Sequence, residues 1–185
     1  ITHYPYEDTN PNDMNAQNHS WTITLNPQVA DTITEIPLLG DVGFAINGIP
    51  FYGPNEAAFP DPYGDPVFNG IMDACMGHPG GQADYHYHSL LVHCLSAGGI
   101  DQEIDTSVPS PIVGFALDGF PIYGPTEQSN GQYPSDLDEL NGHSHSTNEY
   151  EDGTYHYHAT STSPYLLGGF KGKYGSLNGG GYFTN

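Results

Sequence analysis

Short alternations of apolar and polar residues dominate the chain. Within residues 20–25, tryptophan, isoleucine and leucine alternate with serine and threonine, and this period of two predicts a half-buried strand. Residues 31–39 are a second strand-prone stretch, shortened by Pro37. Glycine and proline interrupt the remainder so often that a helix longer than two turns could form only around 69–76 or 136–141.

One segment of the chain occurs twice. Residues 42–54 read VGFAINGIPFYGP, and residues 113–125 read VGFALDGFPIYGP. Each copy is followed by Asp-x-x-x-Gly-His and then by Tyr-His-Tyr-His. The Asn-Gly or Asp-Gly pair inside each copy predicts a hairpin with a type I′ turn, whose two central positions need positive φ.

This repetition sets the expected architecture. We predict a mainly β fold, a single domain built from two pseudo-symmetric β-rich repeats with long Gly/Pro-rich loops and little helix. Its expected parts are an N-terminal arm with strands (1–39), a first repeat (40–110), a second repeat (111–172) and a Gly-rich tail (173–185).

Charge narrows the classes of partner. The chain carries 22 acidic residues against two basic ones and has a formal charge of -20. Nucleic acid and anionic membrane surfaces are excluded because both require positive charge on the protein, and no apolar run approaches the ~20 residues of a membrane-spanning helix. Divalent cations at fixed sites are expected to offset the repulsion among the carboxylates.

Both cysteines lie in the first repeat. In the second repeat, Leu140 and residues 168–169 stand at the positions that correspond to Cys75 and Cys94. Because both cysteines are absent together, we predict a Cys75–Cys94 disulfide that stabilises the fold by about 3 kcal/mol; two buried free thiols are the alternative. This disulfide, the scarcity of lysine and a chain that begins with Ile1 predict an extracellular protein, secreted or at the cell surface.

Histidines of the repeated motifs are the candidate ligands for a transition metal. Alternate side chains of a strand share one face, so His86 and His88 project together, and a glycine turn brings His78 beside them. Three imidazoles suit zinc or copper. The second repeat offers the same set in His143, His156 and His158, and His145 is an additional histidine beside it. The alternative is a metal-free network of His and Tyr hydrogen bonds.

The remaining histidines lack this support and are expected to be ordinary surface or core residues: His3, His19 and His93. Aspartates are the candidates for a harder cation. Asp73 and Asp138 precede the Gly-His turn at equal spacing, where they either orient an imidazole or ligate calcium themselves. Further calcium candidates are Asp136, Asp118 with its counterpart Asn47, Asp152, and the region of Asp61 and Asp65. None has EF-hand spacing, and a solvated turn is the commoner role of a single Asp.

Taken together, these motifs resemble the YHYH domain family, a group of largely secreted bacterial proteins. The resemblance covers about residues 43–172 and rests on these segments: GFALDGFPIYG, DLD followed by NGH, GTYHYH, PY with GFKG, and YHYH at 85–88. The chain departs from the family pattern at Leu140 and just before Phe170, where a Cys is usual, which implies that a second disulfide has been lost. For function the resemblance implies metal binding, and no catalytic residue is carried over.

Two functions fit this pattern. The first is an extracellular, divalent-metal-binding structural protein, a surface or matrix component that self-associates as a homo-oligomer or a calcium-bridged filament, because two similar halves permit head-to-tail contacts. The alternative is a secreted copper- or zinc-dependent metalloenzyme acting on a small molecule or glycan, with Tyr87 or Tyr157 as proton donor. The chain has no Gly-x-Ser-x-Gly, Walker or dinucleotide motif, which favours the structural protein.

Overall fold

The computed structural model describes residues 12–56, 64–89, 109–127 and 130–174. Within these ranges the regular structure consists of β-strands without a helix, so the mainly β prediction is confirmed. Residues 69–76 and 136–141, where the sequence left room for a helix, form turns and irregular backbone. Among the described residues, nothing qualifies as a helix able to cross a bilayer.

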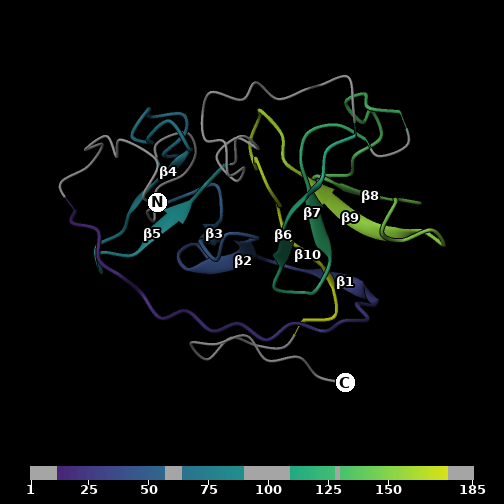
Figure 1. Cartoon of the computed structure of the whole chain (residues 1–185), viewed down its shortest axis with the longest axis horizontal. Helices are drawn as coiled ribbons and strands as arrows, with labels where there is room; N and C mark the ends of the chain where they lie inside the picture. Colours follow the sequence, from purple (N-terminus) through teal and green to yellow (C-terminus); the bar gives the residue numbers. More distant parts are fainter. Residues whose placement is uncertain (1–11, 57–63, 90–108, 128–129, 175–185) are drawn as a thin grey trace.

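The strands form two sheets (Figure 1). One sheet has eight strands in the order β4-β5-β3-β2-β6-β7-β9-β8, and the other pairs β1 with β10. The first repeat supplies the half that ends at β2 and the second repeat supplies the half that begins at β6, and these two strands pair antiparallel. The strand bounds are β1 Val29–Thr34, β2 Asp41–Ala45, β3 Pro50–Tyr52, β4 Gly77–Pro79, β5 Tyr85–Tyr87, β6 Ile112–Ala116, β7 Pro121–Tyr123, β8 Gly142–His145, β9 Thr154–His158 and β10 Phe170–Gly172.

The two predicted hairpins, β2-β3 and β6-β7, are present, but their turns are not type I′. Only the glycines have positive φ, at 82° for Gly48 and 92° for Gly119. Asn47 Oδ1 accepts a hydrogen bond from the Ile49 amide, and Asp118 Oδ1 accepts one from the Phe120 amide. These side chains support the turn themselves, so a single left-handed glycine after them suffices.

Residues 20–25 have no regular secondary structure and include a bend at Leu25, so the strand predicted there is wrong. Leu25 is 97% exposed. An alternating pattern gives a segment an apolar face, but a strand also needs a neighbouring strand to form hydrogen bonds with. Trp21 holds this segment instead: its ring stacks on Phe44 at 4.9 Å, and its Nε1 donates to Asp41 Oδ2. The second strand-prone stretch contributes to β1.

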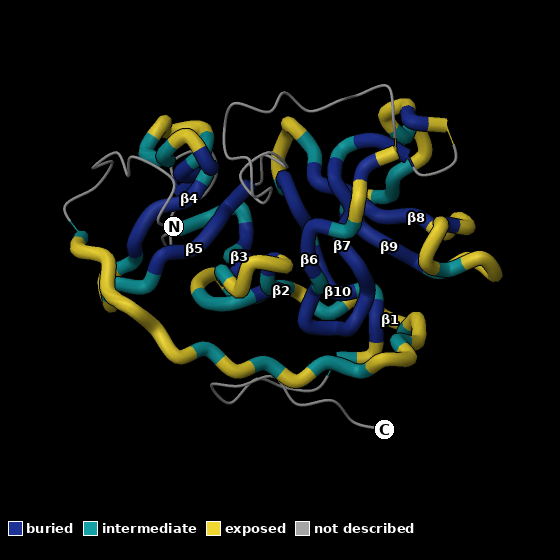
Figure 2. The backbone as a smooth tube through the Cα atoms, in the orientation of Figure 1, coloured by how far each residue is buried: buried dark blue, intermediate teal, exposed yellow. Residues whose placement is uncertain are grey.

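The core lies along the strands of the large sheet, which are mostly buried, whereas the N-terminal segment that passes along one side is largely exposed (Figure 2). Tyrosines of β5 and β9 join the hydrophobic core. Because side chains alternate along a strand, the histidines between these tyrosines face the opposite side of the sheet. This alternation separates an apolar layer from a polar layer that contains the candidate site.

The junction of β2 and β6 requires glycine. A Cβ on Gly43 would lie 2.6 Å from the carbonyl oxygen of Phe115. This distance is too short for a van der Waals contact, so the backbone of one strand would have to move. We expect Gly43→Ala to lower the free energy of unfolding by about 1–3 kcal/mol, measured by urea denaturation. The control is Gly81→Ala, where the new Cβ meets nothing within 4 Å; equal stability of the two variants would contradict this explanation.

Candidate metal centre

Two aspartate-capped turns deliver the first histidine of each set. Asp73 Oδ1 accepts hydrogen bonds from the backbone amides of Cys75 and Gly77. Asp138 Oδ1 accepts the equivalent pair from residues 140 and 142. A tyrosine hydroxyl from the adjacent strand donates to each carboxylate, Tyr85 to Asp73 at 2.6 Å and Tyr155 to Asp138 at 3.0 Å. The turns are therefore fixed to the strands that carry the other histidines.

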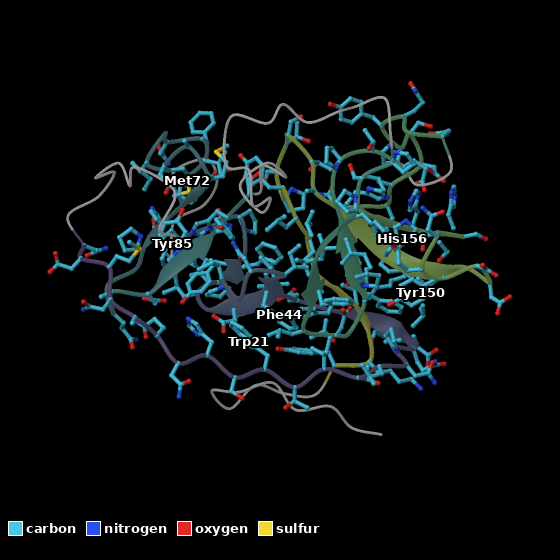
Figure 3. The ribbon with its side chains drawn as sticks, viewed as in Figure 1. Trp21, Phe44, Met72, Tyr85, Tyr150 and His156 are labelled. Atoms are coloured by element: carbon cyan, nitrogen blue, oxygen red, sulfur yellow. The ribbon has the colours of Figure 1, made fainter. Side chains whose placement is uncertain are left out.

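Strand register then sets the histidines side by side. His78 on β4 lies opposite His86 on β5, and His143 on β8 lies opposite His156 on β9. His88, directly after β5, and His158, on β9, complete the two sets, because residues two apart in extended backbone share a face. Figure 3 shows His156 among the crowded polar side chains of this region.

A glutamate joins each set, and the sequence analysis missed both. Glu56 Oε1 lies 2.8 Å from His78 Nε2, and Glu127 Oε2 lies 2.9 Å from His143 Nε2. Each glutamate stands two residues beyond the repeated segment, after Gly-Pro-Asn in one copy and Gly-Pro-Thr in the other. Their equal placement in the two copies was the available signal.

We define two clusters from these residues. The first cluster is Glu56, His78, His86 and His88, and the second cluster is Glu127, His143, His156 and His158. In each cluster one ligand atom per residue lies within 4.8 Å of all the others. The histidines are buried in both clusters, and Glu127 is buried as well, whereas the Glu56 side chain is 28% exposed.

Every histidine in the clusters is held through Nδ1 by an oxygen that can only accept a hydrogen bond. A neutral imidazole carries one N–H, so a Nδ1 that donates leaves Nε2 as a bare lone pair. This anchoring is the arrangement found behind metal-bound histidines. The Nδ1 acceptors are the backbone oxygens of Ile71 for His78, Asp84 for His86, Gly53 for His88, Thr154 for His156 and Gly124 for His158, and Asp136 Oδ1 for His143.

The freed Nε2 atoms converge. They are 3.1 Å apart between His86 and His88, and His143 Nε2 lies 3.1 Å from His156 Nε2 and 3.2 Å from His158 Nε2. Two nitrogens that each lie about 2.05 Å from a tetrahedral zinc ion are about 3.3 Å apart. The spacing thus fits ligands that share one ion.

Lone pairs at this distance repel one another unless a positive charge lies between them. His78 Nε2 is buried and forms no hydrogen bond of suitable geometry within the described part of the chain, although Glu56 Oε1 is only 2.8 Å away. The close approach therefore has the distance but not the direction of a hydrogen bond. A cation bound by both atoms would account for it.

Burial favours the neutral form of four of the cluster histidines. Desolvation is the main cause that lowers the pKa of His86 to about 4, and the charge of neighbouring His78 adds to it. The pKa of His156 is lowered to about 4 in the same way, mainly by desolvation and then by His158. Desolvation also lowers the pKa of His88 and of His158. Neutral imidazole is the form that binds metal.

A third group lies on the outside of the second cluster. Asp136 accepts from His143 Nδ1 through Oδ1, and its Oδ2 lies 3.1 Å from His145 Nε2. The hydrogen bond from His143 lowers the pKa of Asp136. Asp136 is 54% exposed and His145 41% exposed. This outer pair of Asp136 and His145 reaches solvent, unlike the cluster beneath it.

Other aspartates singled out from the sequence lie apart from these groups. Asp73 and Asp138 hold turns, and Lys171 Nζ lies 3.6 Å from Asp138. Asp118 is fully buried and accepts from the Tyr157 hydroxyl and the Gly172 amide. Asp152 lies in an exposed turn. Asp65 accepts from the Tyr165 hydroxyl at 2.7 Å.

Several predicted features lie outside the described residues: His3, Asp61, His93 and Cys94. Cys75 is buried, and its disulfide with Cys94 stays a prediction. His19 is described and stacks on Trp21 at 5.0 Å.

The lowered histidine pKa values predict how the metal-free protein responds to acid. The unfolded chain binds protons on these rings below about pH 6.5, whereas folded His86 and His156 do so only near pH 4. The unfolded state then holds more protons, so the free energy of unfolding should fall by a few kcal/mol as pH drops from about 6.5 to 4. Urea denaturation of EDTA-treated protein measures this fall, and His86→Gln should make it shallower. An equal fall in both proteins would contradict the assignment.

Comparison with known proteins bears on these clusters. A family model described as YHYH protein matches residues 20–134 and 128–172, a span that contains both clusters. No curated protein and no solved structure matches the chain. Since the matched residues make up well over half of the 185-residue sequence, the chain belongs to the YHYH protein family.

Proposed function

We propose that the protein binds one divalent transition-metal ion in each cluster and that the ions are structural. It would then be a metal-stabilised extracellular scaffold, a surface or matrix component that self-associates. The observation that supports this most directly is the convergence of three anchored imidazoles and one carboxylate in both halves.

The number of donors favours a structural ion over a catalytic one. Structural zinc sites are closed by four protein ligands, whereas catalytic sites hold three and leave a position for water or substrate. Each cluster offers four protein donors. In the second cluster all four residues are buried. This geometry supports the scaffold over a copper- or zinc-dependent metalloenzyme.

The donor types point to the class of metal. Imidazole nitrogen suits zinc and copper, whereas calcium takes six to eight oxygen ligands. Calcium, if it acts on this protein, would bind carboxylates outside the clusters. The formal charge of -20 supplies a general attraction for such ions.

An ion in either cluster would join parts of the chain that are distant in sequence. In the first cluster it would connect Glu56, just beyond β3, to the β4-β5 pair. Closing such long connections restricts the unfolded chain and stabilises the fold. The short strands, three residues each for β3, β4 and β5, explain why the fold benefits from cross-links.

Self-association follows from the arrangement of the halves. We infer that the repeats form pseudo-symmetric halves, since their strands occur in mirrored order and end in β4 at one edge and β8 at the other. Two edge strands permit head-to-tail contact between copies. Copies with this much negative charge repel one another, so bridging calcium ions would favour a filament. An extracellular location agrees with the predicted disulfide and the family resemblance.

Removal of metal tests this proposal. Protein purified without chelator should contain one zinc or copper ion per cluster by elemental analysis. Dialysis against EDTA should lower the melting temperature by at least about 5 °C, because an ion present well above its Kd adds about 3 kcal/mol of stability. Light scattering should show calcium-dependent growth in particle size. Metal content, melting temperature and size that all stay unchanged would refute the proposal.

A pair of variants places the ions. Glu127→Gln keeps the shape of the side chain but removes the charged donor, so the second cluster should bind its ion at least about tenfold more weakly. Glu151→Gln removes one charge from an exposed turn outside the clusters and should behave as the unaltered protein. Equal metal content and affinity in the two variants would exclude Glu127 as a ligand.

A further inference from the structure

The two clusters differ in how solvent reaches them. In the first cluster the carboxylate itself is partly open, since the Glu56 side chain is 28% exposed. In the second cluster Glu127 is only 5% exposed, and the His158 side chain beside it is fully buried. A hydrated cation therefore meets a donor of the first cluster directly but finds those of the second cluster covered.

The outer pair of Asp136 and His145 adjoins the second cluster and is itself exposed to solvent. His145 stacks on His143 with ring centroids 4.2 Å apart. Its Nε2 lies 3.1 Å from Asp136 Oδ2, and its Nδ1 lies 4.0 Å from Glu127 Oε2. His145 thus contacts the exposed carboxylate with one nitrogen and approaches the buried carboxylate with the other.

The first repeat has neither member of this pair. Ile71 stands at the position of Asp136, and Gly80 stands at that of His145. His78 Nδ1 accordingly donates to the Ile71 backbone oxygen, where His143 Nδ1 donates to a carboxylate. The outer donors occur only in the half whose glutamate is buried.

We propose that Asp136 and His145 form an outer cation site through which the second cluster is loaded. The inference rests on the proposed function, because it supplies the route by which the proposed ion enters. A partly hydrated zinc or copper ion binds first to the exposed carboxylate and the His145 imidazole. It then exchanges these ligands for Glu127 Oε2, which lies 2.9 Å from His143 Nε2 and 3.6 Å from His158 Nε2.

Each transfer along this route is a ligand exchange on one ion. The group on the outside has three members, Asp136, His143 and His145, and the second cluster has four. Because His143 Nδ1 donates to Asp136, only Asp136 and His145 remain to hold an ion there, and they hold it weakly. A hollow lined by Ser144, His145, Ser146 and Asp152 borders His145, so water and ions reach its ring. The cation moves inward because donors become more numerous and solvent is excluded, which strengthens every charge interaction.

Loading kinetics test this role. Metal-free full-length protein is mixed with Co²⁺, whose visible absorption reports tetrahedral binding, and uptake is followed by stopped flow. We expect two phases, one for each cluster. His145→Ala should slow one phase at least about tenfold, which is the lower end of the effect that local charge has on association rates. The other phase and the final cobalt content should stay unchanged.

Two further variants separate this role from general effects. Asp31→Asn removes one exposed negative charge from β1, away from the route, and it should load at the unaltered rate. Asp136→Asn should slow the same phase as His145→Ala, and it should also weaken final binding because Asp136 orients His143.

The outcomes distinguish the two proposals. Two cobalt ions that load at unchanged rates in His145→Ala would overturn the outer site and leave the proposed function intact. A lower final cobalt content in His145→Ala would also overturn it, since His145 would then be a ligand of the resident ion. An unaltered protein that binds no cobalt would refute the proposed function and the outer site together.

Discussion

Each cluster depends on one interaction, the hydrogen bond from a histidine Nδ1 to a fixed oxygen acceptor. Backbone carbonyls hold five of the six rings, and Asp136 holds the sixth. These bonds leave the Nε2 lone pairs pointing at one another. The need for a cation follows from these converging lone pairs and the close carboxylate. The depressed pKa values come from burial, against which the backbone hydrogen bonds act.

The surrounding fold supplies the oxygen acceptors in fixed positions. Gly53 directly follows β3, and Gly124 directly follows β7. Their carbonyl oxygens accept hydrogen bonds from Nδ1 of His88 and His158. Aspartate-capped turns place the first histidine of each cluster, and the tyrosines between the others anchor β5 and β9 in the core. The two residue types of the Tyr-His-Tyr-His motif therefore have different roles. The tyrosines pack in the core on one face of the strand, and the histidines form the site on the other face.

Periodicity and repetition could predict the hairpins, the mainly β fold and the convergence of His86 with His88, since these depend on local geometry. Repetition also marks Glu56 and Glu127, which stand at the same place after each copy, but only the fold shows that this place lies beside the imidazoles. The alternation at residues 20–25 failed for a related reason. A strand needs a partner, and the alternating pattern describes one chain only.

The central claim is that three Nε2 atoms and one carboxylate oxygen in each cluster surround a single cation. X-ray absorption spectroscopy at the metal edge of the zinc-loaded protein measures this arrangement directly. The account predicts a shell of four nitrogen and oxygen atoms at about 2.0 Å, with outer-shell scattering from three imidazole rings. A shell made of oxygen alone, or one with a single imidazole, would contradict it.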